Sequence, residues 1–132
     1  MIKQMLTAKK APLLLTVSLF LATVQAGTLD GATQAQEDNV AIGREARAIG
    51  RNATAIGDFS FADADFSVTF GSSSVASGAG GSALGNSAEA SGAASTAVGN
   101  FAAARALNSS ALGANAMAEG ANSVALGFES FA

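Results

Sequence analysis

A glycine recurs at every seventh residue through most of this chain. Between residues 43 and 127 this seven-residue grid has thirteen positions, of which eleven are glycine; Ala64 and Ala106 are the exceptions. The residue two places before each grid position is alanine in twelve of the thirteen cases, and Thr69 is the exception. So short a period, kept over most of a chain, is typical of a solenoid or a fibre.

A seven-residue period also occurs in coiled coils, but the glycines argue against one here. Each glycine inside a helix costs about 1 kcal/mol, and the grid lacks the paired apolar seam of a coiled coil. An alternating pattern fits better, because the grid position and the residues two and four before it are nearly always Ser, Ala or Gly, while those between can be large. Each unit is therefore predicted to be a strand of about five residues with one face of small side chains, followed by a two-residue turn.

The residue just before each grid position shows that the true period is fourteen. Alternate units carry a large apolar residue there: Ile42, Ile56, Phe70, Leu84, Val98, Leu112 and Leu126. The units between them carry Ile49, Asp63, Ser77, Ser91, Arg105 and Glu119. Two strands and two turns then form one coil, and coils stacked about 4.8 Å apart form a roll of two parallel sheets. The predicted fold class is an all-β parallel β-roll, or solenoid, with 14-residue coils and a lumen wide enough only for Ala, Ser and Gly.

The seven large apolar residues, here called the apolar ridge, are predicted to form one exposed stripe on one outer face. Three valines and two threonines two residues before ridge positions widen it: Val40, Thr54, Val68, Thr96 and Val124. A contiguous exposed apolar stripe marks an interaction surface. We expect self-association through the ridge, with a monomeric roll that uses the ridge to bind another surface as the alternative.

The first 38 residues differ from the repeat. Three lysines precede the apolar run of residues 11–22, and the small residues Val24 and Ala26 stand where signal peptidase reads. That run is shorter than the roughly 20 residues of a membrane span. We therefore predict an exported chain with a signal peptide at 1–26, a flexible lead-in at 27–38 and a repeat head domain at 39–132.

The composition excludes several functions. After removal of the signal peptide the chain keeps four arginines against ten acidic residues, which argues against binding nucleic acid or anionic lipid. The chain has no Cys and no His, so thiolate and imidazole catalysis are impossible. Asp63 and Asp65 are a nearby carboxylate pair, but a narrow roll offers no cleft for them. We predict that the chain is not an enzyme and holds no cofactor or metal.

Three local clusters near the start of the repeat invite functional interpretations. Asp58, Asp63 and Asp65 could suggest a calcium site, but calcium loops need more oxygen ligands at a defined spacing, so we favour a solvated turn. Three phenylalanines are predicted to cover the roll or to bind a partner: Phe59, Phe61 and Phe66. Three arginines form a candidate basic patch for acidic glycans or matrix, although a solvated face is the favoured interpretation: Arg44, Arg47 and Arg51.

The string NSVALG at residues 122–127 and its copies, such as TAIG ending at Gly57 and TAVG ending at Gly99, resemble the head repeats of YadA-like trimeric autotransporter adhesins. The resemblance covers residues 39–132. It implies a left-handed roll, packed as a homotrimer, that projects from the outer membrane and attaches to host extracellular matrix, host cells or sister bacteria. The trimer interface would be the apolar ridge, from Ile42 to Leu126.

The chain also departs from that family. Family members continue into a neck, a coiled-coil stalk and a β-barrel anchor, whereas the sequence given stops inside a repeat at residues 128–132 and has no membrane-spanning segment. It is interpreted as part of a full-length adhesin at the cell surface, as a truncated fragment, or as a complete secreted or periplasmic head. A secreted solenoid with an ice-binding or other structural role is the second functional hypothesis. It is less favoured because Arg47, Phe61 and Asp63 stand where a threonine array is needed.

Overall fold

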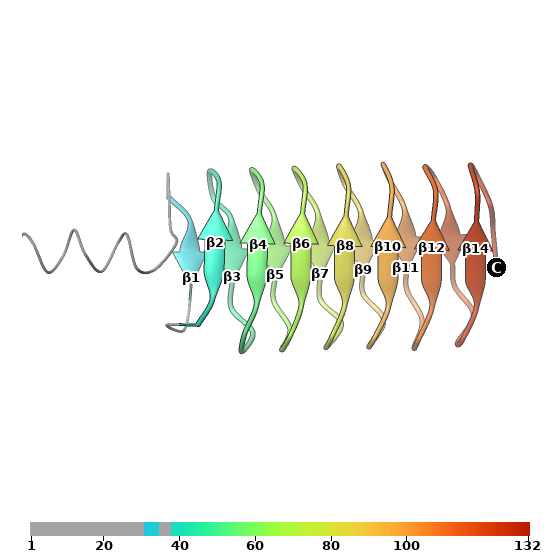
Figure 1. The fold of residues 1–132 in the computed structure, drawn as a ribbon, viewed down its shortest axis with the longest axis horizontal. Helices are drawn as coiled ribbons and strands as arrows, with labels where there is room; N and C mark the ends of the chain where they lie inside the picture. The colour runs from blue at the N-terminus through green and yellow to red at the C-terminus, as the bar shows by residue number, and fades with distance from the viewer. Residues whose placement is uncertain (1–30, 35–37) are drawn as a thin grey trace, which may run out of the picture.

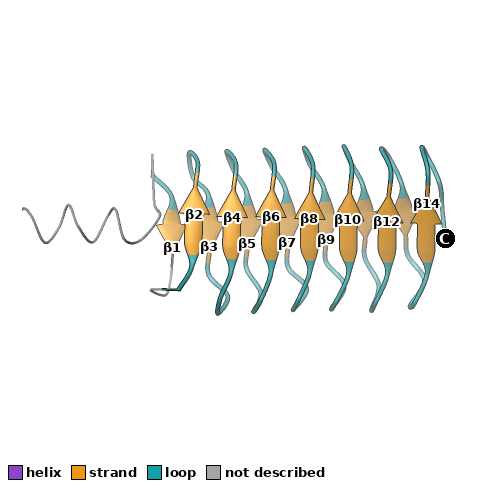
Figure 2. Ribbon diagram, viewed as in Figure 1, coloured by secondary structure: helices purple, strands orange, loops and turns teal. Residues whose placement is uncertain are grey.

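Two parallel sheets lie back to back along the whole described part of the chain, which comprises residues 31–34 and 38–132 of a computed structural model (Figure 1). One sheet, the even sheet, contains β2 (Val40–Ile42), β4 (Thr54–Ile56), β6 (Val68–Phe70), β8 (Ser82–Leu84), β10 (Thr96–Val98), β12 (Ser110–Leu112) and β14 (Val124–Leu126). The other, the odd sheet, contains β1 (Thr33–Gln34), β3 (Arg47–Ala48), β5 (Phe61–Ala62), β7 (Val75–Ala76), β9 (Glu89–Ala90), β11 (Ala103–Ala104) and β13 (Met117–Ala118). Strands and loops alone form this region (Figure 2).

The register of both sheets has the predicted period of fourteen. Ala97 in β10 lies beside Ala83 and Ala111 of the neighbouring coils, and every other strand pairs in the same parallel way. The turns are bonded from coil to coil as well, as where the Phe101 amide donates to the Asn86 carbonyl at 3.0 Å. The structure thus confirms the all-β parallel roll with 14-residue coils.

The lumen is as narrow as predicted. Its wall consists of fully buried alanines such as Ala83 and Ala97, together with buried serines and Thr69, the one departure from alanine two places before the grid. Most buried serine hydroxyls bond locally, as where Ser60 Oγ donates to the Gly57 carbonyl at 2.8 Å; the buried Ser95 hydroxyl is an exception without a partner among the described residues. These short local bonds explain why serine is acceptable in an otherwise apolar lumen.

Stacking begins earlier than the repeat pattern indicates. β1 lies inside the segment 27–38 predicted as a flexible lead-in, and the Thr33 amide donates to the Ala46 carbonyl at 2.7 Å. The pattern does not mark this strand because Gln34 stands where alanine is expected. Next to it, buried Asn39 bonds to the Ala48 carbonyl (2.9 Å) and to the Ala53 amide (3.0 Å). The predicted signal peptide, 1–26, lies outside the described residues.

Backbone geometry explains which positions of the seven-residue grid require glycine. Glycines that follow even-sheet strands have positive φ, for example +134° at Gly99, and an added Cβ there would lie 2.5 Å from the Gly113 carbonyl oxygen. Only glycine tolerates both the φ and the close approach. Ala64 and Ala106 both follow odd-sheet strands, where φ is not positive. The two alanine exceptions therefore fall where φ does not require glycine, although the next coil is close there too: a Cβ added to Gly78 would lie 2.0 Å from the Gly92 carbonyl oxygen.

Candidate interaction surfaces

The roll offers four surfaces: the outer face of each sheet and two rows of turns. The upper edge comprises the turns that follow even-sheet strands, with residues 44–45, 58–59, 72–73, 86–87, 100–101, 114–115 and 128–129 at their tips. The lower edge comprises the turns that precede those strands, with Asp38 and residues 51–52, 65–66, 79–80, 93–94, 107–108 and 121–122. The last residue of each two-residue tip has positive φ, so side chains at these tips project outward from a fixed backbone.

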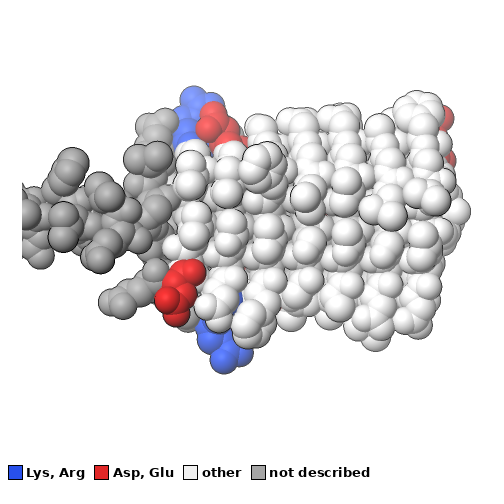
Figure 3. All heavy atoms as spheres, in the orientation of Figure 1, with Lys and Arg blue, Asp and Glu red and all other residues white. Residues whose placement is uncertain are grey.

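The even sheet brings the predicted apolar ridge together in one row. Val98 lies beside Leu84 and Leu112 in register, and the other ridge residues continue the row in both directions. Several ridge side chains are well exposed in the single chain, including Phe70 (59%) and Leu126 (73%). Figure 3 shows this face without any charged side chain over its strands. It is therefore a continuous, uncharged and largely apolar surface.

The odd sheet carries a different chemistry. Arg105 pairs with Glu89 (2.9 Å) and with Glu119 (3.1 Å), one on each neighbouring coil. The hydrogen bond from Arg105 holds the pKa of the Glu89 carboxyl below its ordinary value. Farther along the same face, Arg47 pairs with Asp63 at 2.6 Å. This outer face thus carries ion pairs at two places, and Arg105 is not the freely solvated side chain that its position in the sequence suggests.

The structure does not support a basic patch formed by the three N-terminal arginines. Arg44 lies on the upper edge, Arg47 on the odd sheet and Arg51 on the lower edge, so three different surfaces receive one arginine each. Each arginine also pairs with an aspartate of the next coil. The patch was the less favoured interpretation and depended on the three residues being close in sequence, but the coil reverses direction between them.

The three aspartates are separated in the same way. Asp58, Asp63 and Asp65 lie on the upper edge, the odd sheet and the lower edge, and each accepts a hydrogen bond from an arginine one coil earlier. The hydrogen bonds from Arg51 lower the pKa of the Asp65 carboxyl. Within residues 31–34 and 38–132, no three His, Cys, Asp or Glu side chains gather closely enough to hold a metal ion.

The three N-terminal phenylalanines do not form one cluster either. Phe59 lies 5.0 Å from the Arg44 guanidinium carbon on the upper edge, and Phe61 lies 4.8 Å from that of Arg47 on the odd sheet. Phe66 projects from the lower edge and is 59% exposed. They therefore do not cover the roll as a group.

The edges also carry exposed apolar residues that sequence reasoning missed. Phe101 (56%) and Phe128 (71%) lie on the upper edge, and Leu107 (54%) lies on the lower edge. The signal that could have revealed them is the identity of the two residues after each grid position. No helix in the described part of the chain is long and apolar enough to cross a membrane.

Most of the repeat region matches one protein-family model. The model described as the YadA head domain repeat, which contains two copies of the repeat, matches residues 40–60, 48–74, 76–102 and 104–130. A search of curated proteins gives no match.

Proposed function

The chain belongs to the YadA head family, and from that premise we propose that it is an adhesin head that assembles as a homotrimer. We propose that this head attaches bacteria to host extracellular matrix, to host cells or to one another. The family is one of structural, surface-exposed adhesin modules, which agrees with the β-solenoid described above. The proposal includes export directed by residues 1–26 and exposure of the head at the cell surface.

The observation that carries the proposal is the contrast between the two sheet faces. The even sheet is uncharged and exposes a row of large apolar side chains, whereas the odd sheet displays the ion pairs of Arg47 and Arg105. An apolar stripe of this length on a narrow roll is characteristic of an assembly surface. Fully burying one such side chain contributes about 1.5 to 3 kcal/mol relative to leaving it exposed. The trimer interface of this proposal is the apolar ridge, from Ile42 to Leu126.

The odd sheet then faces outward and is available to ligands. It carries ion pairs at two places along the roll, Arg47 with Asp63 and Arg105 with Glu89 and Glu119, so several weak contacts can form at once. A trimer presents three such faces, and linked weak contacts raise avidity by orders of magnitude without a tight individual site. Host matrix fibres and the surfaces of neighbouring cells are themselves repetitive, which suits this mode of binding.

The assembly is tested with a matched pair of lysine substitutions. Val98→Lys places a charge in the apolar ridge, whereas Ser77→Lys places the same charge at an exposed position of the odd sheet. Sedimentation is expected to show a trimer for the unmodified protein and for Ser77→Lys, and a monomer for Val98→Lys, because an unpaired buried charge is costly. If the Val98→Lys variant still sediments as a trimer, the apolar ridge is not the trimer interface.

The adhesive role is tested with the same variants. Binding to immobilised collagen, fibronectin and laminin, and clumping of bacteria that display the head, are measured side by side. The unmodified protein is expected to be active in at least one assay, and Val98→Lys to lose avidity. A trimeric head that neither binds a matrix protein nor clumps cells would contradict the adhesive role.

A further inference from the structure

The two edges of the roll differ in chemistry over its C-terminal half. From residue 79 on, the lower edge carries small or aliphatic tips, with Asn108 and Asn122 as its polar side chains. From residue 72 on, the upper edge carries hydroxyl and amide side chains with two exposed phenylalanines, one alanine and one carboxylate: Ser72, Ser73, Asn86, Ser87, Asn100, Phe101, Ala114, Asn115, Phe128 and Glu129. Over these coils only the upper edge combines aromatic rings with several hydrogen-bonding groups.

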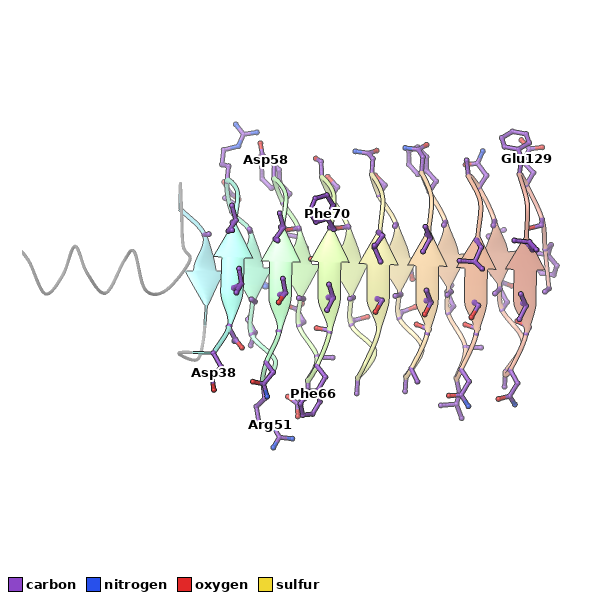
Figure 4. The ribbon with its side chains drawn as sticks, in the orientation of Figure 1. Asp38, Arg51, Asp58, Phe66, Phe70 and Glu129 are labelled. Atoms are coloured by element: carbon purple, nitrogen blue, oxygen red, sulfur yellow. The ribbon has the colours of Figure 1, made fainter. Side chains whose placement is uncertain are left out.

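Six tip residues of three successive coils form a two-by-three array on the upper edge, here called the upper platform. Each coil contributes one pair: Asn100 with Phe101, Ala114 with Asn115, and Phe128 with Glu129. Figure 4 shows Glu129 at this edge, with Asp58 farther along the same edge. Successive coils are about 4.8 Å apart, so the two phenylalanines, two coils apart, are separated by about 10 Å along the roll.

The backbone of the upper platform is held by hydrogen bonds from coil to coil. The Phe101 amide donates to the Asn86 carbonyl at 3.0 Å, and the Asn115 amide donates to the Asn100 carbonyl at 2.9 Å. The Glu129 amide bonds to the preceding coil in the same way. Because the backbone is already ordered, a ligand that binds these side chains does not have to order it, which lowers the cost of binding.

The polar side chains of the upper platform keep atoms available for a ligand. Asn100 Nδ2 donates to Asn86 Oδ1 at 3.2 Å, which orients the Asn100 amide and turns its Oδ1 away from Asn86. Within residues 31–34 and 38–132, that Oδ1, the Asn115 amide and the Glu129 carboxylate form no side-chain hydrogen bond, and all three residues are exposed. The upper platform therefore offers acceptors and a donor beside its two rings.

This combination matches the two kinds of surface on a sugar. A β-linked glucose-type sugar carries C–H groups on the faces of its ring and hydroxyl groups around its rim. The C–H faces can pack on Phe101 and Phe128, which are 56% and 71% exposed. Rim hydroxyls can donate to Asn100 Oδ1 and to the Glu129 carboxylate. The small side chain of Ala114 leaves room for a further sugar between the two rings.

The charges on the upper edge select against anionic ligands. Its one arginine, Arg44, lies at the first coil and pairs with Asp58. No cation is therefore available beside the upper platform within the described part of the chain, and Glu129 repels anions there. Sulfated or sialylated glycans lack a countercharge at this place, whereas an uncharged glycan needs none.

From this arrangement we infer that the upper platform binds uncharged oligosaccharides built from β-linked glucose or N-acetylglucosamine units. The inference rests on the proposed adhesive role and names a ligand class for it. The Asn115 amide, between the two rings along the edge, is placed to bond to the middle sugar. The upper platform is an open surface, so each site binds weakly, and attachment depends on several sites that act together in one assembly.

Binding of free oligosaccharides to the full chain, followed by ligand-observed nuclear magnetic resonance, tests the inference. The probes are cellotetraose and chitotriose, with heparin as the anionic comparison. The unmodified protein is expected to bind at least one neutral probe and to show no binding of heparin. Phe101→Ala and Phe128→Ala are each expected to weaken binding about tenfold, because a stacked ring is lost. Leu107→Ala is the matched control: Leu107 is 54% exposed on the lower edge, and its loss should leave binding unchanged.

Several results would overturn the inference. These are binding of neither neutral probe, equal weakening by Phe101→Ala and Leu107→Ala, and tighter binding of heparin than of the neutral probes. A Phe101→Ala variant that sediments differently from the unmodified protein would assign the ring to the assembly instead of to a ligand, which also overturns the inference. Circular dichroism of each variant verifies that the roll is folded.

Failure of this inference is distinguishable from failure of the proposed function. One oligosaccharide needs one site, so the measurement does not depend on the trimer. A head that sediments as a monomer and still binds a neutral probe would support the inference and contradict the proposed assembly. A trimeric head that adheres to a matrix protein but binds neither neutral probe would contradict the inference and leave the adhesive role in place.

Discussion

Replacing Gly99 by alanine tests the geometry of the roll most directly. Gly99 ends β10 with φ +134°, and a Cβ placed on it would lie 2.5 Å from the Gly113 carbonyl oxygen and 2.6 Å from the carbonyl carbon. Those are backbone atoms of the next coil, so no side chain can rotate away. The next coil must move, and it is held there by the Gly113 amide, which donates to the Val98 carbonyl at 2.8 Å.

The expected cost combines two effects. Holding alanine at a φ that essentially only glycine adopts costs about 1 to 3 kcal/mol. Moving the next coil weakens roughly two backbone hydrogen bonds, each with a net contribution of about 0.5 to 1.5 kcal/mol. The sum is about 4 kcal/mol, which corresponds to a decrease in Tm of roughly 15 to 30 °C for a domain of this size.

The matched control is the same substitution at Gly120, which follows the odd-sheet strand β13. There φ is not positive, and the nearest atom to an added Cβ is the Ser123 Cβ at 3.4 Å. Gly120→Ala is expected to change stability by less than about 1 kcal/mol. Thermal unfolding followed by far-ultraviolet circular dichroism, at equal protein concentration, measures both variants. Equal Tm values for Gly99→Ala and Gly120→Ala would refute the stacking geometry proposed for the glycine grid.

Three further predictions concern the lumen, the end of the roll and the ion pairs. Ala97→Leu overfills the lumen and should lose about 3 kcal/mol in urea unfolding, whereas Ser77→Leu, on the outer face, should lose less than about 1 kcal/mol; equal losses would contradict the lumen. Asn39→Ala removes the hydrogen bonds to the Ala48 carbonyl and the Ala53 amide and should lower the unfolding free energy by about 1 to 3 kcal/mol, measured by urea unfolding. Because Arg105 lowers the folded-state pKa of Glu89, that carboxyl should stabilise the fold above its ordinary pKa of 4.5 and lose this effect as the pH falls further. Glu89→Gln should therefore flatten the acid side of the stability profile, and an unchanged profile would contradict the ion pair.

Much of the fold follows from the sequence because the rule is local and is repeated. One 14-residue coil specifies which residues point inward, and each neighbour along the stack is found by adding fourteen, as with Ala83, Ala97 and Ala111. The same fourteen-residue spacing predicts the apolar ridge. β1 was not predicted because Gln34 stands where alanine is expected. The backbone of β1 nevertheless pairs with β3 in the same parallel way as the other strands.

The side-chain partners of the charged residues were less predictable. Arg47 and Asp63 are sixteen residues apart, and their pairing depends on both lying outward on the odd sheet. Proximity in sequence made Arg44, Arg47 and Arg51 a candidate patch, although a solvated face was the favoured interpretation. Seven residues along this chain lead to the opposite side of the roll, so neighbours in sequence are separated in space.

The sequence by itself determined the period, the small inward side chains and the row of large apolar residues, because stacking relates each residue to the one fourteen places later. Only the tertiary structure decided how the four surfaces are arranged around a coil. That arrangement depends on turns whose last tip residue is left-handed, such as Phe101 with φ +57°, a conformation that bulky residues rarely adopt on their own. Hydrogen bonds between the turns of successive coils hold this backbone, and these turns place Phe101 on the opposite edge from Ala94.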